Sequence, residues 1–430
     1  MKTIKFNKFS LVSFLTIGAF MMFGTGFSQK KQTTSTDTES IRPFQYHAAQ
    51  ADLDNLKKRI LATNWPEKET VQDASQGVQL ETMKALAKYW ASTYDWRKIE
   101  KKLNSYPNYI TNIDGLDIHF IQVKSKHKNA LPLIITHGWP GSIIEQMKII
   151  DPLVNPTAYG GKGEDAFDVV IPSMPGYGFS GKPTATGWGP EHIAKAWDIL
   201  MKRLGYTTYV AQGGDWGAIV VDQQGVQAPQ GLLAIHTNMA GVIPDDINGA
   251  AFSGLPAPAG LSTDEKLAYD RVQNVYQKGI AYGFQLGLRP QTMYGIADSP
   301  IGLAAYFLDH DARSYALISR VFQGQSEGLT KDDVLDNITL TWLTNTGISG
   351  ARLYWEYWGK GYFTVKGVKV PVAVSVFPDE LYPAPKSWAE KAYPKLIYYN
   401  KVEKGGHFAA WEQPEIFTNE IRAAFKSVRK

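Results

Sequence analysis

The sequence predicts an α/β fold with a mostly parallel sheet, helices on both faces, an inserted helical lid and an N-terminal helical segment. Three observations lead to this prediction. Short apolar runs recur from residue 131 onward, with helical patterns between several of them, which is typical of a parallel sheet. Between about 240 and 365 these runs stop, and helical pieces rich in Tyr, Gly and Leu replace them. Two amphipathic helical patterns precede the first strand.

The composition excludes several classes of function. The 430 residues include 12 Trp and 22 Tyr, and 44% are hydrophobic, which suffices for one large core and a roomy apolar pocket. The net charge is only +4 without a basic stripe, so nothing indicates nucleic-acid binding. Because the chain has no cysteine, disulfides, thiol catalysis and cysteine-based zinc sites are excluded. The eight histidines form no H-E-x-x-H or similar spacing, and we expect neither a metal nor a cofactor.

The first 28 residues have the features of a secretory signal peptide. Lysines precede an apolar run over residues 9–27, and small residues end this run. We expect cleavage after Ser28 and export of the mature protein, which would be periplasmic or secreted. The alternative is an uncleaved membrane anchor, although Ser, Thr and Gly dilute the apolar run. The polar residues 29–40 are predicted to be a linker.

Residues 41–107 are predicted to form the N-terminal helical segment. Apolar residues at helical spacing mark one helix over residues 50–63 and a second over residues 80–94. Each helix has one apolar face, so both must dock on a larger body.

The sheet is expected within residues 108–430. It begins with a β-hairpin, because Asp114-Gly115 favours a two-residue turn between residues 110–113 and 116–123. Further strands are predicted at residues 131–136, 167–171, 208–211, 232–236, 370–377 and 396–402. Helical patterns such as residues 193–204 lie between several of these strands. The lid at about 240–365 is expected to close over the carboxyl ends of the strands, where the sites of α/β proteins lie.

One turn between a strand and a helix carries the main functional signal. In Gly213-Gly214-Asp215-Trp216-Gly217, an aspartate holds the position that a nucleophilic serine occupies in the G-x-S-x-G turn. A carboxylate that attacks a strained or activated saturated carbon forms an ester, which water can cleave. The substrate class is therefore an epoxide or a compound with a carbon–halogen bond. The alternative is that Asp215 only caps the helix that begins at Trp216.

A base and an orienting acid are expected in the chain order nucleophile, acid, histidine. His407 lies after the last apolar run on a glycine-flanked loop, where the base is expected. Asp379 and Glu380 follow the preceding run, and spacing alone does not separate them. Asp336 in the lid and Glu403, expected on the last strand, are weaker candidates for the acid.

A candidate oxyanion hole lies at the end of the first core strand, in His137-Gly138-Trp139-Pro140. Such a loop acts together with the residue after the nucleophile, so the donors would be the backbone N–H groups of Trp139 and Trp216. A tight turn that needs Gly and Pro is a compatible explanation.

Three motifs in this order resemble the microsomal-type epoxide hydrolases of the α/β-hydrolase superfamily. The motifs are His137-Gly138-Trp139-Pro140-Gly141-Ser142, Gly214-Asp215-Trp216-Gly217 and Gly405-Gly406-His407-Phe408-Ala409-Ala410-Trp411-Glu412. Residues 42–103 are similar to the N-terminal segment of that family, so the resemblance covers essentially everything after the linker. It implies that Asp215 is the nucleophile and His407 the base. The acid of the family matches Glu380 in Phe377-Pro378-x-Glu380-Leu381 rather than Asp379.

The resemblance also implies two lid tyrosines that hold the epoxide oxygen. One matches Tyr354 and the other Tyr282, although the residues after Tyr282 depart from the Thr-Lys-Pro ending of the family. Tyr294 and Tyr276 are the next candidates for this second position. Two phenol O–H groups suit the negative charge that develops on an opening epoxide. The expected partners are a small apolar epoxide and water, membrane contact requires an uncleaved N-terminus, and a homodimer is compatible with the family.

Three other functions fit parts of the pattern. A haloalkane dehalogenase shares the aspartate and histidine but needs N–H donors for a halide, so the lid tyrosines and the N-terminal segment favour the epoxide. A non-catalytic ligand binder on the same fold is opposed by the complete set of nucleophile, acid, base and tyrosines. An ordinary esterase is disfavoured because no serine occupies the turn.

Overall fold

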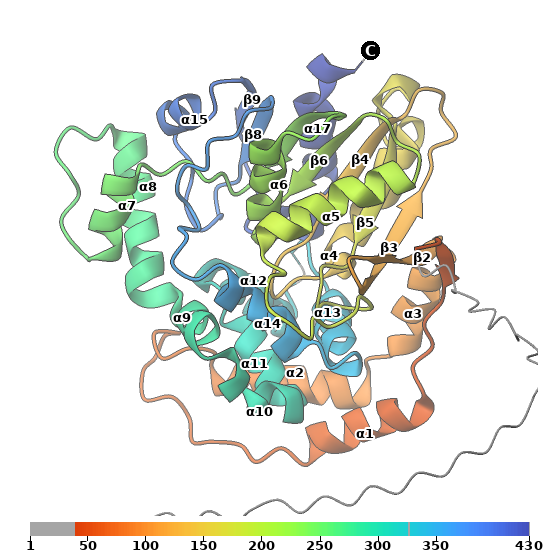
Figure 1. The fold of residues 1–430 in the computed structure, drawn as a ribbon. Coiled ribbons are helices and arrows are strands. Elements are labelled where there is room, and N and C mark those ends of the chain that lie inside the picture. The colour runs from red at the N-terminus through yellow and green to blue at the C-terminus, as the bar shows by residue number, and fades with distance from the viewer. Residues whose placement is uncertain (1–38, 326, 430) are drawn as a thin grey trace, which may run out of the picture. The chain divides into compact units, whose positions relative to one another are not determined.

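The computed structural model describes residues 39–325 and 327–429. In this part of the chain, nine strands form one sheet in the order β1-β2-β3-β5-β4-β6-β7-β8-β9 (Figure 1). The strands are β1 (Arg42–Phe44), β2 (Asn108–Ile113), β3 (Leu116–Val123), β4 (Leu131–Thr136), β5 (Phe167–Pro172), β6 (Tyr209–Gly213), β7 (Leu232–Thr237), β8 (Val372–Val376) and β9 (Leu396–Lys401). Strands β4 to β9 pair in parallel, which confirms the predicted α/β sheet.

The antiparallel end of the sheet contains one expected and one unexpected feature. Strands β2 and β3 form the predicted hairpin, with Ile113 paired to Leu116 and with positive φ angles of 51° at Asp114 and 83° at Gly115. Strand β1 pairs antiparallel with β2 and was not expected within the N-terminal helical segment. Its three residues include Pro43, and such a short edge strand has no periodic signal in the sequence.

The two faces of the sheet carry separate hydrophobic cores. Ile134 of β4 packs in the core that includes residues of α5 (Pro190–Arg203) and α6 (Trp216–Gln227). Its neighbours Leu133 and Ile135 point the other way, into the core that includes residues of α4 (Ile143–Val154) and α17 (Pro414–Ala424). Because both faces are buried, the strand sequences are continuous apolar runs rather than alternating ones.

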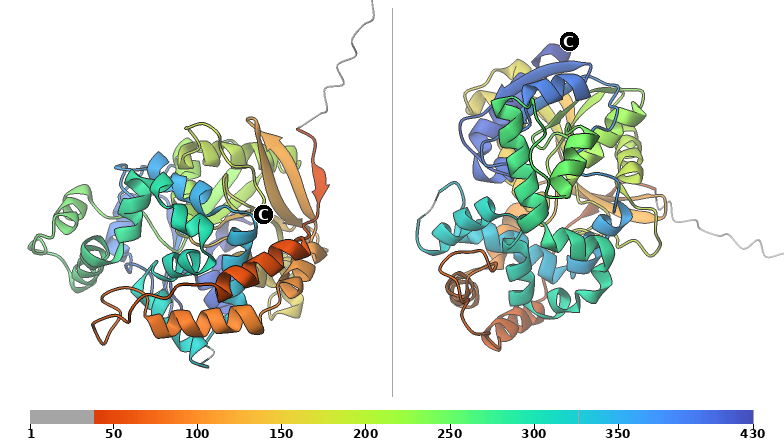
Figure 2. Two further views of the ribbon diagram at one scale, coloured as in Figure 1. Left: turned by 90° about the horizontal axis from the view of Figure 1, so that it is seen from below. Right: turned by 90° about the vertical axis from the view of Figure 1, so that its left-hand side faces the viewer.

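Helices and irregular segments connect β7 to β8 and form the lid (Figures 1 and 2). The helices are α7 (Asp245–Phe252), α8 (Thr263–Asn274), η3 (Val275–Gly279), α9 (Ala281–Leu288), η4 (Pro290–Thr292), α10 (Tyr294–Asp298), α11 (Pro300–Leu308), α12 (Ala312–Phe322), α13 (Lys331–Leu343) and α14 (Gly347–Glu356). Among the described residues of this insertion, none belongs to a strand of the sheet.

Smaller helices complete the fold. They are α15 (Lys386–Ala392), α16 (Ala409–Glu412) and the 3-10 helices η1 (Pro156–Ala158), η2 (Gly163–Asp165) and η5 (Lys426–Val428). The helix α16 follows directly on the loop that carries His407.

The helices before the sheet dock mainly on the lid. The helices α1 (Gln50–Leu61) and α2 (Leu80–Ser92) agree with the two predicted helices, and α3 (Trp96–Ser105) was not expected. Thr82 of α2 hydrogen-bonds Ser319 of α12 at 3.0 Å, and Trp90 donates to Thr339 of α13 at 3.1 Å. In Figure 2 these helices lie against the lid. The N-terminal segment therefore supports the lid from the side away from the sheet.

The predicted signal peptide and most of the predicted linker lie outside the described residues. Within the described ranges, none of the helices has the length and apolar character needed to cross a membrane.

Candidate active site

Asp215 stands on a strained turn between β6 and α6. Its backbone has φ 51° and ψ −126°, a conformation that costs energy for a residue with a side chain. The turn is so tight that a Cβ on Gly213 would overlap the carbonyl oxygen of Gly217. The Asp215 side chain makes no capping hydrogen bond to α6. The carboxylate is therefore free for other contacts, and the capping explanation of this aspartate is wrong.

The loop after β4 meets the Asp215 carboxylate directly. Gly138 lies so close that a Cβ there would overlap Asp215 Oδ1. The backbone N–H of Trp139 donates to the same oxygen at 2.6 Å. His137 accepts from the Met174 N–H through Nε2 at 3.1 Å, so its Nδ1–H donates to the carbonyl of Gly138 at 2.9 Å and holds the loop.

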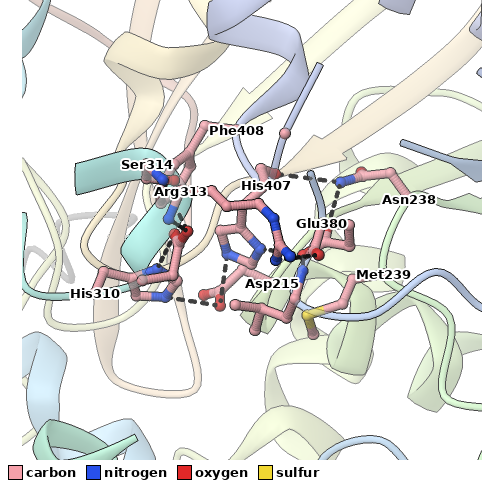
Figure 3. A network of polar contacts seen from close by, with 12 residues as sticks. Asp215, Asn238, Met239, His310, Arg313, Ser314, Glu380, His407 and Phe408 are labelled. Atoms are coloured by element: carbon pink, nitrogen blue, oxygen red, sulfur yellow. Dashed lines mark hydrogen bonds and ion pairs between the residues drawn. The ribbon is translucent and has the colours of Figure 1, made fainter. Parts of the chain in front are cut away.

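His407 lies between the Asp215 carboxylate and a buried glutamate (Figure 3). Its Nδ1 is 2.5 Å from Glu380 Oε1, and its Nε2 is 3.2 Å from Asp215 Oδ2. Glu380 also accepts from the Leu381 N–H at 2.7 Å and from Asn238 Nδ2 at 3.4 Å. Both oxygens of Glu380 thus accept hydrogen bonds, so His407 Nδ1 donates to Oε1 and Nε2 faces Asp215.

The other acidic candidates lie elsewhere. Asp379 pairs with Arg313 at 3.3 Å, and its side chain is 60% exposed. Asp336 accepts from the hydroxyl of Tyr94 at 2.8 Å, on the side of α13 that faces the N-terminal segment. Glu403 is exposed and follows the end of β9, so the expectation that it lies on the last strand is wrong.

The electrostatics of the cluster favour an ionised Asp215. Burial alone would raise the pKa of Asp215, but the imidazoles of His310 and His407 hold it well below its usual range. Burial would lower the pKa of His407, yet the carboxylates of Glu380 and Asp215 raise it well above its usual range. A carboxylate is thus available at the turn although the site is shielded from solvent.

A cavity of about 20 Å³ lies beside Asp215 and His407, large enough for one water molecule. Glu145 and Asn238 also line it. Glu145 is buried, and burial raises its pKa to about 7. Its Oε1 accepts from the Gly138 N–H at 3.3 Å, whereas its Oε2 has no hydrogen-bond partner among the described residues.

Tyr282 of α9 and Tyr354 of α14 pack on the two tryptophans that flank the carboxylate. The ring of Tyr282 stacks on Trp139 at 5.0 Å between centroids, and Tyr354 meets the edge of Trp216 at 4.7 Å. The two phenol rings are 5.9 Å apart. Burial raises the pKa of both phenols well above the usual range, so both are O–H donors.

The two reserve tyrosines do not share this environment. Tyr294 is 66% exposed. Tyr276 donates its hydroxyl to Asn248 Oδ1 at 2.7 Å.

A second histidine, which the sequence patterns did not indicate, also faces the carboxylate. His310 lies between α11 and α12, is buried, and has its Nε2 3.8 Å from Asp215 Oδ2. Its ring is 4.6 Å from that of His407 between centroids. Asp215, His310 and His407 each offer one ligand atom, and these three atoms lie within 4.8 Å of one another. In the described part of the chain, these residues are the ones that could hold a cation.

The fold and the turn define an α/β-hydrolase with a carboxylate at the nucleophile position. Family models agree, because residues 132–270 match the α/β-hydrolase fold and residues 41–146 match the epoxide hydrolase N terminus. The chain is 48% identical to a Stigmatella aurantiaca protein with a provisional epoxide hydrolase name, over 90% of this chain and 86% of that one. It is 33% identical to epoxide hydrolase 1 of Sus scrofa, over 94% of this chain and 92% of that one.

A solved structure of an epoxide hydrolase is also similar to this chain in its fold. The juvenile hormone epoxide hydrolase of the silkworm Bombyx mori superposes with a TM-score of 0.79 at 31% identity, over 91% of this chain and 95% of that one. The chain therefore belongs to the epoxide hydrolase family, in its microsomal-type branch.

Proposed function

We propose that this protein hydrolyses an epoxide to a vicinal diol through a covalent ester on Asp215. The observation that carries the proposal is the environment of this one carboxylate. Oδ1 is held by the Trp139 N–H at 2.6 Å, and Oδ2 faces the imidazole of His407 at 3.2 Å. One oxygen is thus fixed by a backbone donor and the other is directed toward the base.

The first step opens the ring. Oδ2 of Asp215 attacks a ring carbon, the bond from that carbon to the epoxide oxygen breaks, and the oxygen leaves with the electron pair. Tyr282 and Tyr354 donate hydrogen bonds to this oxygen, and one of them transfers its proton. Neutral phenols packed on Trp139 and Trp216 support this role, because a donor in a water-poor site is worth more than one in water.

The second step cleaves the ester with water. A water molecule in the cavity beside Glu145 gives a proton to His407 Nε2, while its oxygen attacks the Asp215 carbonyl carbon. Glu380 stabilises the imidazolium through its contact with Nδ1. The N–H groups of Trp139 and Trp216 stabilise the oxyanion. Collapse of the tetrahedral intermediate releases the diol oxygen, which takes the proton from the imidazolium. The proton that the attacking water left on the Asp215 carboxyl then restores the tyrosine that was deprotonated in the first step.

The substrate class follows from the lining of the lid. A pocket of about 340 Å³ lies in the lid, and its walls include Phe252, Ile280, Phe284 and Trp358. Tyr362 also lines it, and the ring of Tyr362 is 6.2 Å from that of Tyr354 between centroids. These side chains suit an apolar substituent and offer no charged partner. We therefore infer a lipophilic epoxide with its ring at Asp215.

Turnover of such a compound tests the proposed activity. We expect the purified protein to convert an aryl epoxide such as styrene oxide into its diol, measured by chromatography, and to release no halide from a haloalkane. Halide release without diol formation would instead assign the protein to the dehalogenases.

Replacing either lid tyrosine by phenylalanine should slow ring opening. We expect Tyr282→Phe and Tyr354→Phe each to lower the single-turnover rate of ester formation by roughly 10- to 100-fold, because each removes one donor to the developing alkoxide. Tyr294→Phe is the matched control, because the Tyr294 side chain is 66% exposed. Equal loss in the control and in the site variants would contradict the assignment.

The adjacent acidic pair offers a sharp test of the orienting acid. Glu380→Gln should lower turnover by at least ~100-fold, because the amide no longer stabilises the imidazolium of His407. Asp379→Asn changes the neighbouring, largely exposed carboxylate and should keep the parent rate within about twofold. The measurement is the steady-state turnover rate of each variant. A large loss in Asp379→Asn together with a parent-like rate in Glu380→Gln would assign the acid to Asp379.

We also infer that the mature protein is exported, from the lysine-flanked apolar run in the first 28 residues. N-terminal sequencing of the protein from its native host should find Gln29 as the first residue in the periplasmic or extracellular fraction. An intact N-terminus in the membrane fraction would support the anchor instead.

A further inference from the structure

Two imidazoles, each backed by a carboxylate, face the same oxygen atom. His407 is held by Glu380 through Nδ1, as described above. His310 is held in the same way by Asp311, with Nδ1 3.0 Å from Asp311 Oδ2. Figure 3 shows His310 and His407 next to each other beside the Asp215 carboxylate, each with a dashed contact to it.

The position of the hydrogen on His310 follows from its neighbour. Asp311 is the N-cap of α12, where its Oδ1 accepts from the N–H groups of Arg313 and Ser314 at 3.0 and 2.8 Å. This residue is therefore a carboxylate, and His310 Nδ1 must donate to it. His310 Nε2 is directed toward Asp215 Oδ2 and offers a lone pair there once the ring is neutral. This nitrogen is buried and has no hydrogen-bond partner among the described residues.

Three atoms that can serve as metal ligands, once both imidazoles are neutral, thus lie close together. They are Asp215 Oδ2, His407 Nε2 and His310 Nε2, which all lie within 4.8 Å of one another. The other carboxylate oxygen, Oδ1, is already occupied by the Trp139 N–H. Three carboxylates in and behind the cluster, those of Asp215, Glu380 and Asp311, give it negative charge in a buried place. Such an arrangement attracts a positive charge, which can be a proton or a metal ion.

Two of the three distances between the ligand atoms are near those of a first-row divalent metal site. Zinc bonds of about 2.0–2.2 Å to imidazole nitrogen and carboxylate oxygen place neighbouring ligand atoms of a tetrahedral site roughly 3.3–3.6 Å apart. The distances from Asp215 Oδ2 are 3.2 Å to His407 Nε2 and 3.8 Å to His310 Nε2. In zinc sites, the second nitrogen of an imidazole ligand commonly donates to a carboxylate, as it does here.

We propose that Asp215, His310 and His407 form a binding site for a divalent transition-metal ion such as Zn²⁺, and that its occupation inhibits the enzyme. The inhibitory part rests on the proposed function, because the ion would occupy the nucleophilic oxygen and the nitrogen of the base. Two imidazoles and one carboxylate favour Zn²⁺, Co²⁺ or Cu²⁺ over Mg²⁺ and Ca²⁺, which prefer oxygen ligands. His310 is the residue that distinguishes this site from an ordinary nucleophile–base pair.

Direct binding tests the site without reference to activity. Tag-free, chelator-treated protein is titrated with ZnCl₂ in a calorimeter, with MgCl₂ as the comparison ion. We expect one Zn²⁺ per chain and no comparable binding of Mg²⁺. His310→Phe should lower the Zn²⁺ affinity by at least ~100-fold, and Asp311→Asn, which keeps the imidazole but alters its orientation, by about 10- to 100-fold. His47→Gln changes an exposed histidine and should bind Zn²⁺ as the parent does.

Two further readouts complete the test. Co²⁺ in the parent should give visible d–d absorption bands that are lost in His310→Phe, and Zn²⁺ should inhibit epoxide turnover in competition with the substrate. Equal Zn²⁺ affinity in the parent and in both site variants, or no stoichiometric binding to the parent, overturns the proposed site. Binding without inhibition of an active enzyme overturns the inhibitory part. Binding to a protein that turns over no epoxide leaves the site standing and contradicts the proposed function.

Discussion

Asp215→Asn is expected to lower epoxide turnover by on the order of 10⁴-fold or more. The amide oxygen is a much weaker nucleophile than the carboxylate. The amide is also neutral, so it lacks the negative charge that the neighbouring imidazoles stabilise. The measurement is diol formation by freshly prepared protein. Mass spectrometry of the peptide must exclude hydrolysis of the introduced amide back to the carboxylate during the assay, because a small fraction of restored enzyme would imitate residual activity.

A second buried aspartate provides the matched control for this variant. Asp222 lies on α6 and is buried, and it contacts the hydroxyl of Tyr393 at 3.1 Å rather than the site. Asp222→Asn should therefore retain turnover within a few-fold of the parent. A protein in which Asp215→Asn turned over epoxide as fast as the parent would require another nucleophile.

His407→Gln is expected to separate the two chemical steps. Ring opening does not need the base, so the variant should consume about one equivalent of epoxide and then stop. Intact mass should rise by the mass of the epoxide, and digestion should locate the addition on the peptide with Asp215. Turnover should fall by roughly 10³-fold or more, because the base oriented by Glu380 is lost and the other imidazole, His310, lies farther from Asp215 Oδ2, at 3.8 Å.

The adduct distinguishes this mechanism from general-base attack of water on the epoxide. If His407 instead activated water for direct attack, His407→Gln would lose activity without forming any adduct. Unmodified protein after long incubation, with an active parent under the same conditions, would therefore rule out the ester.

The chain order and the glycine-bounded turns made much of the site predictable. Asp215 and His407 stand out because strands end immediately before their loops, and parallel strands bring their carboxyl ends to one edge of the sheet. The choice of Glu380 over Asp379 came only from the family resemblance. Spacing cannot decide between two adjacent carboxylates, since the bend after β8 determines which of them turns inward.

The remaining residues of the site carry no local signal. His310 lies in a lid turn far along the chain from both Asp215 and His407, and no periodic pattern links these three residues. No metal-ligand spacing in the sequence therefore marks this cluster, which forms only when the lid folds over the sheet. Glu145 is similarly hidden, because a glutamate in the first turn of a helix is usually exposed, whereas Glu145 is buried and lines a cavity with Asp215.

A single turnover in H₂¹⁸O tests the central claim most directly. Enzyme in excess over the epoxide is mixed in labelled water and quenched after one cycle, and the diol and the Asp215 peptide are analysed by mass spectrometry. If the ester forms on Asp215, the diol of the first cycle carries no ¹⁸O, and the label appears in the Asp215 carboxylate. A labelled diol with an unlabelled Asp215 peptide would mean that water attacks the epoxide directly, which contradicts the mechanism.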